Sequence, residues 1–194
     1  AVGRGEQDSA LRDGRIAALA VDGNTRDLKL LNELPVRGKG PCHVSLDAAG
    51  RHALVANYGD GSVEVFGINP VGTLAERTAF ARHTGSSVNP KRQEGPHAHS
   101  IYPDPTGKLV VAADLGTDQV HVYEFDADSG SLTPADPPTV KLPPGAGPRH
   151  MAWHAKGHRL YVLNELASGV SVLEYDNGKF NLSQTVSALP DDFA

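Results

Sequence analysis

The chain contains few of the features that build disulfide scaffolds, membrane spans or nucleic-acid surfaces. Its 194 residues include a single cysteine, which excludes an intrachain disulfide and indicates a reducing compartment such as the cytoplasm. Its longest apolar runs are about five residues, whereas a transmembrane helix needs about 20. The formal net charge is −5 and there is no run of Lys or Arg, which argues against a nucleic-acid partner. We expect a cytoplasmic protein that binds neither membranes nor nucleic acids.

Helical periodicity is also absent, and turn residues are abundant in its place. No segment repeats its apolar residues at the 3.6-residue spacing of an amphipathic helix. The sequence has 21 Gly and 14 Pro, the residues that most often interrupt secondary structure and form tight turns. This composition predicts short strands joined by turns, and therefore an all-β fold.

One unit recurs three times along the chain. Each copy begins with Gly-Pro, carries a histidine shortly afterwards, and reaches a second glycine before a short apolar strand. The second glycines are Gly50, Gly107 and Gly157, at spacings of 57 and 50 residues. Self-similarity at this spacing is typical of a repeat architecture, in which no unit buries its apolar face alone.

Each unit is predicted to contain four short strands, which in roughly 50 residues are the signature of a β-propeller blade. The chain then holds about four blades' worth of a single domain, with two blades complete and two partial. Their approximate bounds are residues 1–39, 40–94, 95–146 and 147–194. Because propellers typically close with about four to eight blades, we expect an open arc. Its edges would be covered by the missing blades of a longer chain or by another chain.

Hairpin geometry brings a pair of charged residues together. Antiparallel strands place opposite one another the residues that are equally distant from the turn centre. With Gly157 as that centre, Arg149 faces Glu165. The equivalent pairs in the other two units are Cys42 with Tyr58 and His99 with Leu115. Cys42, His99 and Arg149 lie at one equivalent point near the start of the innermost strand of their units, and therefore at one mouth of the central channel.

Arg149 and Glu165 depart from the repeat, because the other units have uncharged or apolar residues at these positions. The plain interpretation is an ion pair at the rim, which contributes little to stability. The alternative is a site for a small anion. An arginine fork suits a carboxylate, a phosphate or a developing oxyanion, and a neighbouring carboxylate or imidazole can transfer a proton.

His97 and His99 raise the alternative of a metal site, because alternate residues of a strand share a face. No cysteine or further histidine joins them at ligand spacing, so neither a metal nor an organic cofactor is expected. His150 recurs at the position of His43, which favours a structural role there. Short polar residues also recur at the strand ends and are expected to hydrogen-bond turn backbone. They are Asn57, Asp114 and Asn164.

Several motifs, in order and at matching spacings, resemble a known family over nearly the whole chain. They are Arg92-Gln93, Pro96-His97-Ala98-His99, Ala113-Asp114-Leu115-Gly116-Thr117-Asp118, Gly145-Ala146-Gly147-Pro148-Arg149-His150 and Asn164-Glu165-Leu166. The family is that of the seven-bladed β-propeller lactonases, whose members include 6-phosphogluconolactonases and a muconate lactonizing enzyme. The resemblance implies an active-site histidine, arginine and glutamate at His99, Arg149 and Glu165. It also implies a further active-site arginine on a later blade outside this chain.

The function that the resemblance implies is enzymatic. The leading hypothesis is hydrolysis of a small anionic sugar lactone, 6-phosphogluconolactone, to 6-phosphogluconate. Arg149 would hold the anionic group or stabilise the oxyanion, and His99 or Glu165 would deprotonate water. His97 and His150 would contact the substrate at the rim. Two alternatives stay open: 3-carboxy-cis,cis-muconate cycloisomerisation, and a non-catalytic propeller that serves as a binding platform.

Overall fold

The chain folds into strands and turns. The computed structural model describes residues 2–3, 14–176 and 178–193, and within those ranges no α-helix occurs. The all-β expectation is therefore confirmed. None of the described segments is a helix with the length and hydropathy that crossing a membrane requires.

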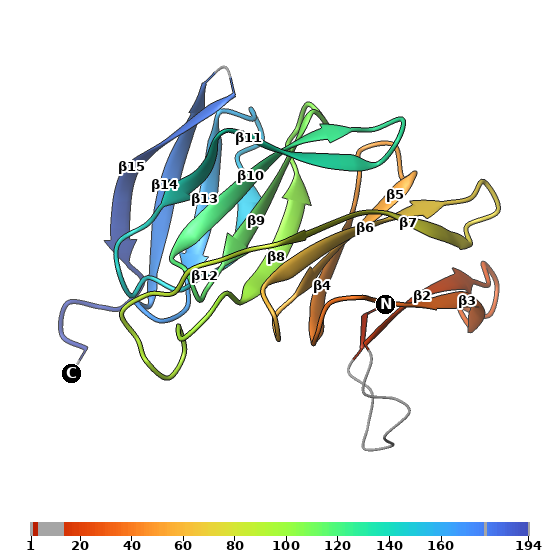
Figure 1. Ribbon diagram of the computed structural model, residues 1–194, viewed down its shortest axis with the longest axis horizontal. Helices are drawn as coiled ribbons and strands as arrows, with labels where there is room; N and C mark the ends of the chain where they lie inside the picture. Colours follow the sequence, from red (N-terminus) through yellow and green to blue (C-terminus); the bar gives the residue numbers. More distant parts are fainter. Residues whose placement is uncertain (1, 4–13, 177, 194) are drawn as a thin grey trace.

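Figure 1 shows four antiparallel sheets that follow one another along the chain. The first sheet consists of β1 (Val2–Gly3), β2 (Arg15–Val21) and β3 (Leu28–Pro35). The second consists of β4 (Pro41–Leu46), β5 (His52–Asn57), β6 (Ser62–Ile68) and β7 (Leu74–Arg82). The third consists of β8 (Ala98–Pro103), β9 (Leu109–Asp114), β10 (Gln119–Asp126) and β11 (Ser131–Lys141). The fourth consists of β12 (Pro148–Trp153), β13 (Arg159–Asn164), β14 (Gly169–Asp176) and β15 (Lys179–Ser187).

The fourth sheet corrects the expected number of complete blades. We expected the last unit to be partial, because the chain ends soon after its outer strand. That outer strand, β15, is already the fourth of its sheet and pairs with β14 from Asp176↔Lys179 to Gly169↔Ser187. Most of its side chains are exposed, so backbone hydrogen bonds rather than an apolar pattern define it. Three of the described sheets are therefore four-stranded, instead of two.

The sheets are arranged as the blades of a propeller that does not close. The inner strands β4, β8 and β12 contact one another, β4 with β8 and β8 with β12. The first and fourth sheets lie at opposite ends of the arc (Figure 1). The predicted open, partial propeller is confirmed.

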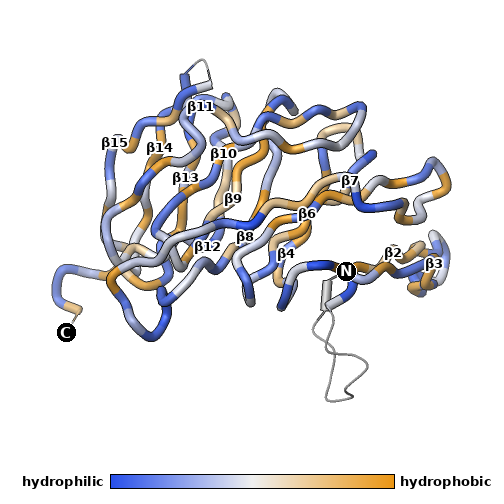
Figure 2. Tube along the Cα trace, in the orientation of Figure 1, coloured by the Kyte–Doolittle hydropathy of each residue, from blue (hydrophilic) through white to orange (hydrophobic). Residues whose placement is uncertain are grey.

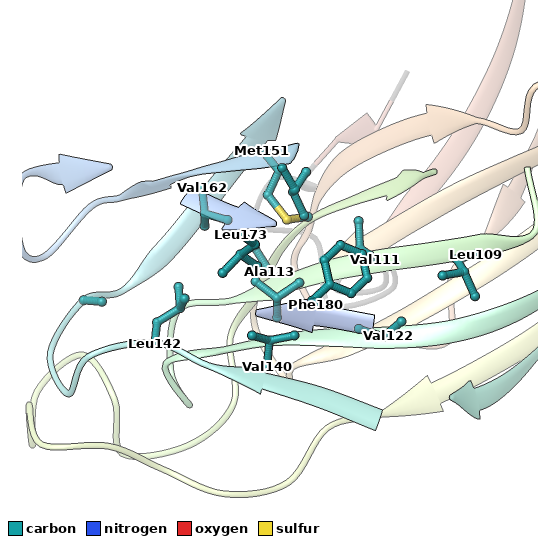
Figure 3. Packing of buried hydrophobic residues seen from close by; sticks show 13 residues of the cluster. Leu109, Val111, Ala113, Val122, Val140, Leu142, Met151, Val162, Leu173 and Phe180 are labelled. Carbon is teal, nitrogen blue, oxygen red and sulfur yellow. The ribbon is translucent and has the colours of Figure 1, made fainter. Parts of the chain in front are cut away.

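Apolar clusters between successive sheets form the core. Apolar residues are concentrated within strands such as β6 and β9, while the exposed turns are largely polar (Figure 2). The cluster between the third and fourth sheets includes Leu142, Met151 and Leu173 (Figure 3). Similar clusters join the first sheet to the second and the second to the third. Burial of apolar surface, at about 25 cal/mol per Å², holds neighbouring sheets together.

Each inner strand contains an irregularity near its start. In β8 the register skips His99, which has no partner of its own in β9. At the same point the register skips Cys42 in β4, and Arg149 with His150 in β12. Such bulges change the direction of a side chain relative to the regular alternation of a strand. The repeated bulge thereby directs residues from three sheets to the same end of the channel.

Candidate active site

A cavity of about 280 Å³ lies where the inner strands meet the turns of the second and fourth sheets. The described residues that line it are Cys42, Tyr58, Arg92, His99, Arg149 and Glu165. Three of them come from the inner-strand bulges and two from the hairpin turns after β5 and β13. Arg92 comes from the connection between β7 and β8 (residues 83–97). Segments from three sheets therefore converge on one small cavity.

Glu165 joins two arginines in this cavity. Its Oε2 lies 2.8 Å from Nε of Arg149, and its Oε1 lies 2.6 Å from Nη2 of Arg92. Nε of Arg149 also donates to Nε2 of His99, at 3.1 Å. The side chains of Arg92 and Arg149 are 42% and 43% exposed. Two positive charges face one negative charge, so the cavity has an excess of positive charge for an anionic ligand.

His99 is held in its neutral form. Arginine has only donors, so Nε2 of His99 accepts the hydrogen bond from Arg149 and the ring proton resides on Nδ1. Burial lowers the pKa of His99, and the positive charge of Arg149 lowers it further. Nδ1 is buried and has no hydrogen-bond partner among the described residues. At neutral pH this imidazole can therefore accept a proton at Nε2.

Glu165 is held in its charged form. Burial acts to raise the pKa of its carboxyl group, but the hydrogen bond from Arg92 and the charges of Arg92 and Arg149 outweigh burial and lower it. The same hydrogen bond raises the pKa of Arg92. Because one carboxylate oxygen accepts a hydrogen bond from Arg92 and the other is ion-paired with Arg149, Glu165 is a weaker base than His99.

Tyr58 forms a wall of the cavity and is supported from behind by His97. The two rings are stacked, with centroids 4.5 Å apart and planes at 17°. Nδ1 of His97 also donates to the backbone carbonyl of Tyr58, at 2.8 Å. The rings of Tyr58 and His99 are nearly perpendicular, with planes at 80° and centroids 5.5 Å apart. Nη2 of Arg92 lies 3.4 Å from the hydroxyl oxygen of Tyr58.

His150 lies beside His99 rather than at the cavity wall. Its ring centroid is 5.3 Å from that of His99 and 5.6 Å from that of His43. Burial lowers the pKa of His43 to about 4, with smaller contributions from its electrostatic coupling to His150 and His99. Neither His97 nor His150 is among the described residues that line the cavity.

A second histidine cluster lies between the second and third sheets. Nδ1 of His83 is 2.6 Å from Oδ2 of Asp114, and the ring of His121 stacks on that of His83 with centroids 3.5 Å apart and planes within 3°. These three residues have the donor atoms of a metal site. In parallel stacked rings, however, the nitrogen lone pairs lie in separate planes and do not converge on one ion at the roughly 2.0–2.1 Å of a zinc–nitrogen bond. Burial lowers the pKa of His121 to about 3, so this ring is neutral and packs on the His83–Asp114 pair.

Arg149 and Glu165 are in contact, as the hairpin argument expected, although the strand register differs by a residue on each side. Pro148 is the residue paired with Asn164, so Glu165 begins the turn. Its N–H donates to the carbonyl of Gly147, at 2.8 Å. The bulge at Arg149 compensates for the difference by allowing its side chain to reach the carboxylate.

The recurring polar residues at the strand ends behave in two ways. Asp114 accepts hydrogen bonds from backbone N–H groups of its own turn, as expected. Asn57 and Asn164 instead donate to the hydroxyls of Ser62 and Ser171 in the next strand. The expectation of backbone bonding is wrong for the two asparagines. Ser62 faces Asn57 across the hairpin, and Ser171 lies two residues beyond Gly169, the residue paired with Asn164.

Sequence reasoning missed two residues of the cavity. Tyr58 received no functional role, although its place opposite Cys42 in the repeat was already a signal. Arg92 belongs to one of the family motifs, but no hairpin symmetry places a residue of a long connection. Its contact with Glu165 spans 73 residues of sequence. The cavity thus has a second arginine within this chain, separate from the one expected on a later blade.

The fold and the cavity together define a class: a partial β-propeller with a charged cavity at one mouth of its channel. The family model described as "Lactonase, 7-bladed beta-propeller" matches residues 4–194. The chain belongs to this family. The resemblance inferred from the motifs is therefore confirmed.

Individual relatives agree with this assignment. A 6-phosphogluconolactonase of Bacillus subtilis is 41% identical over 93% of this chain and 51% of its own length. A 6-phosphogluconolactonase of Formosa agariphila is 34% identical over 85% of this chain and 47% of its own. The solved structure of a periplasmic gluconolactonase from Pseudomonas aeruginosa has a TM-score of 0.89 and 34% identity, covering 99% of this chain and 54% of that one. This chain spans about half the length of the relatives that it matches.

Proposed function

We propose that the complete protein hydrolyses a small anionic sugar lactone, with 6-phosphogluconolactone as the substrate and 6-phosphogluconate as the product. The observation that carries the proposal is the cavity in which Arg92 and Arg149 share the single carboxylate of Glu165. An excess guanidinium charge beside a neutral imidazole suits an anionic substrate whose hydrolysis develops further negative charge. Relatives named 6-phosphogluconolactonase support the choice of lactone.

In this proposal the arginines bind the substrate. The hydrogen bond of Arg149 to His99 and its ion pair with Glu165 both involve Nε, so its terminal Nη groups are left for an anionic group or for the carbonyl oxygen of the lactone. Arg92 adds a second positive charge from the opposite side of Glu165. Glu165 holds both guanidinium groups in place. His97 and His150 support the lining residues Tyr58 and His99 rather than touching the substrate.

His99 is the general base. Nε of Arg149 lies nearer to Oε2 of Glu165 than to Nε2 of His99, at 2.8 Å against 3.1 Å, so a rotation of the guanidinium group can turn its N–H toward Glu165 and let a water molecule replace it at Nε2 of His99. His99 removes a proton from this water while its oxygen attacks the lactone carbonyl carbon, and the arginines stabilise the resulting oxyanion. The intermediate collapses with cleavage of the ring C–O bond. The leaving ring oxygen takes the proton back from His99, which yields the hydroxy acid.

A direct assay tests this function. The complete protein is mixed with 6-phosphogluconolactone, and lactone loss is followed with and without EDTA. We expect rapid hydrolysis that survives chelation, since the proposed residues need no metal. His154→Ala, in the turn between β12 and β13 that contacts no cavity residue, is the matched control and should leave the rate unchanged. Absence of lactonase activity, together with formation of a lactone from 3-carboxy-cis,cis-muconate, would favour the cycloisomerase alternative. Inactivity on both substrates would favour the binding platform.

We also propose that the single domain is completed by further blades, or by another chain, that supply the remaining side of the channel mouth. The open ends of the arc and the length of the relatives support this proposal. For its compartment we propose the cytoplasm, where 6-phosphogluconolactone would be met. Cell fractionation with an antibody to this chain tests the compartment, and recovery from an extracytoplasmic fraction would contradict it.

A further inference from the structure

Asp118 occupies a backbone position that is uncommon for residues with a side chain, although aspartate and asparagine adopt it more readily than most. It ends the turn between β9 and β10 with φ = 54°, in the left-handed region. The equivalent positions in the second and fourth sheets are Gly61, with φ = 62°, and Ser168, with φ = 46°. Glycine adopts this conformation without strain, whereas a residue with a Cβ has an energetic cost there. An aspartate at this position therefore calls for an explanation based on its carboxylate.

The carboxylate of Asp118 is buried, and its four hydrogen bonds all lead out of its own turn. Oδ1 accepts from Nε2 of Gln93 at 2.8 Å and from the N–H of Gly147 at 2.7 Å. Oδ2 accepts from the N–H of Gly145 at 2.6 Å and from the hydroxyl of Ser87. An aspartate that merely stabilised its turn would bond the N–H groups of that turn, as Asp114 does.

The two segments bonded by Asp118 are those that carry the two arginines of the cavity. Gln93 follows Arg92 directly, is fully buried and donates also to the carbonyl of Leu115, at 2.9 Å. Gly147 precedes Arg149 by two residues. One carboxylate thus holds both the β7–β8 connection and the entry to β12. In the long connection, few apolar contacts replace these polar ones, since most of residues 84–92 are exposed or half-buried.

We infer that Asp118 is a positioning residue that sets the distance and direction of Arg92 relative to Arg149. It lies outside the cavity and acts through the two loops. The inference rests on the proposed function for its activity measurements. An error of about 1 Å in the placement of a binding group can reduce the rate by about 100-fold. Loss of the carboxylate should therefore lower activity even though no cavity residue changes.

Two substitutions separate this role from a general effect on folding. Asp118→Asn keeps the shape and tolerates the left-handed backbone, but its amide presents donors to N–H groups that need an acceptor. Asp118→Gly removes the carboxylate and relieves the backbone strain. We expect kcat/KM to fall about 10-fold for the first variant and about 100-fold for the second, with both still folded by circular dichroism. Ser168→Gly, at the equivalent turn position of the fourth sheet, is the control and should retain full activity.

A double-mutant cycle distinguishes positioning from a structural role. If Asp118 acts through the arginines, Asp118→Asn should cost less than about 2-fold when Arg92→Lys and Arg149→Lys are already present, because the interaction that it supports is gone. An undiminished effect in that background would overturn the inference. Full activity of folded Asp118→Gly would overturn it as well.

Binding of 6-phosphogluconate, measured by calorimetry, keeps the two proposals separable. If the wild-type protein binds this anion but hydrolyses no lactone, the proposed hydrolysis fails while the positioning role is still read from affinity. Weaker binding by Asp118→Gly than by Ser168→Gly would then support the inference, and equal binding would contradict it.

Discussion

The turn between β9 and β10 in the third sheet and the turn between β13 and β14 in the fourth sheet share a backbone hydrogen bond but have different roles. In the third, the N–H of Leu115 donates to the carbonyl of His97; in the fourth, the N–H of Glu165 donates to the carbonyl of Gly147. Leu115 is fully buried, whereas Glu165 faces the cavity with its side chain 28% exposed. The repeat fixes where the backbone runs. The side chain at one equivalent position then decides whether a turn contacts the ligand or holds the surrounding loops.

The equivalent turn of the second sheet lies between β5 and β6. Tyr58 occupies the position of Leu115 and Glu165, with its N–H donating to the carbonyl of Gly40. Like Glu165, it lines the cavity. The two outer turns therefore supply cavity residues, while the middle turn supplies Asp118 and a buried leucine. Substitutions of the cavity residues in the outer turns should impair activity directly, and substitutions of Leu115 and Asp118 in the middle turn should act through stability and position.

The largest effect is expected at the ion-pair network of the fourth turn. Glu165→Gln removes the charge that holds two arginines, and Arg149→Lys keeps a charge but loses the planar fork. Each should lower kcat/KM by about 100- to 1,000-fold, with the unfolding midpoint in urea nearly unchanged. His99→Ala should behave in the same way. Near-normal rates for both Arg149→Lys and Glu165→Gln would exclude this cavity as the catalytic site.

The next effect concerns the stability of the middle turn. Leu115→Ala removes a fully buried side chain, and such a cavity costs about 2–5 kcal/mol. Urea denaturation should show this loss in the free energy of unfolding. Leu166→Ala is the matched control in the fourth turn, where the side chain is only half-buried, and should cost less. Equal losses for the two variants would contradict the contrast between the turns.

The pH dependence of activity tests the assignment of His99 as the base. A base works only when unprotonated, so kcat/KM should fall as the pH drops through the pKa of His99. Because burial and then the charge of Arg149 lower that pKa from 6.5, the acid limb should lie below pH 6.5. His99→Gln should remove this limb from the residual activity. A limb that persists in His99→Gln would assign the base to another group.

The smallest effect is expected at Ser168, the position in the fourth turn that corresponds to Asp118. Ser168→Gly relieves the strain of the positive φ of 46° and should change the free energy of unfolding by about 1 kcal/mol or less, because this relief is offset by the greater freedom of the unfolded chain. Lactonase rates should equal those of the wild type. A clear loss of activity would mean that the fourth turn also positions the cavity through its backbone.

Local sequence patterns were sufficient to predict the fold. Alternating and continuous apolar segments marked the strands, and the recurring Gly-Pro units marked the blades, because both depend on residues close together in sequence. The contact of Arg149 with Glu165 was also predictable, since a hairpin is a short-range structure with a simple symmetry. The completeness of the fourth sheet was not, because an outer strand defined by backbone hydrogen bonds has no strong apolar pattern.

The sequence by itself determined the strands, the repeat and the pairing of residues across single hairpins, all of which follow from local geometry. Only the tertiary structure decided that Arg92 reaches Glu165 and that His97 supports Tyr58 from behind. It also decided that Asp118 joins the two arginine-bearing segments. These contacts link loops from different sheets, and their geometry depends on how neighbouring sheets pack and where each bulge falls. No periodicity within one segment encodes that arrangement.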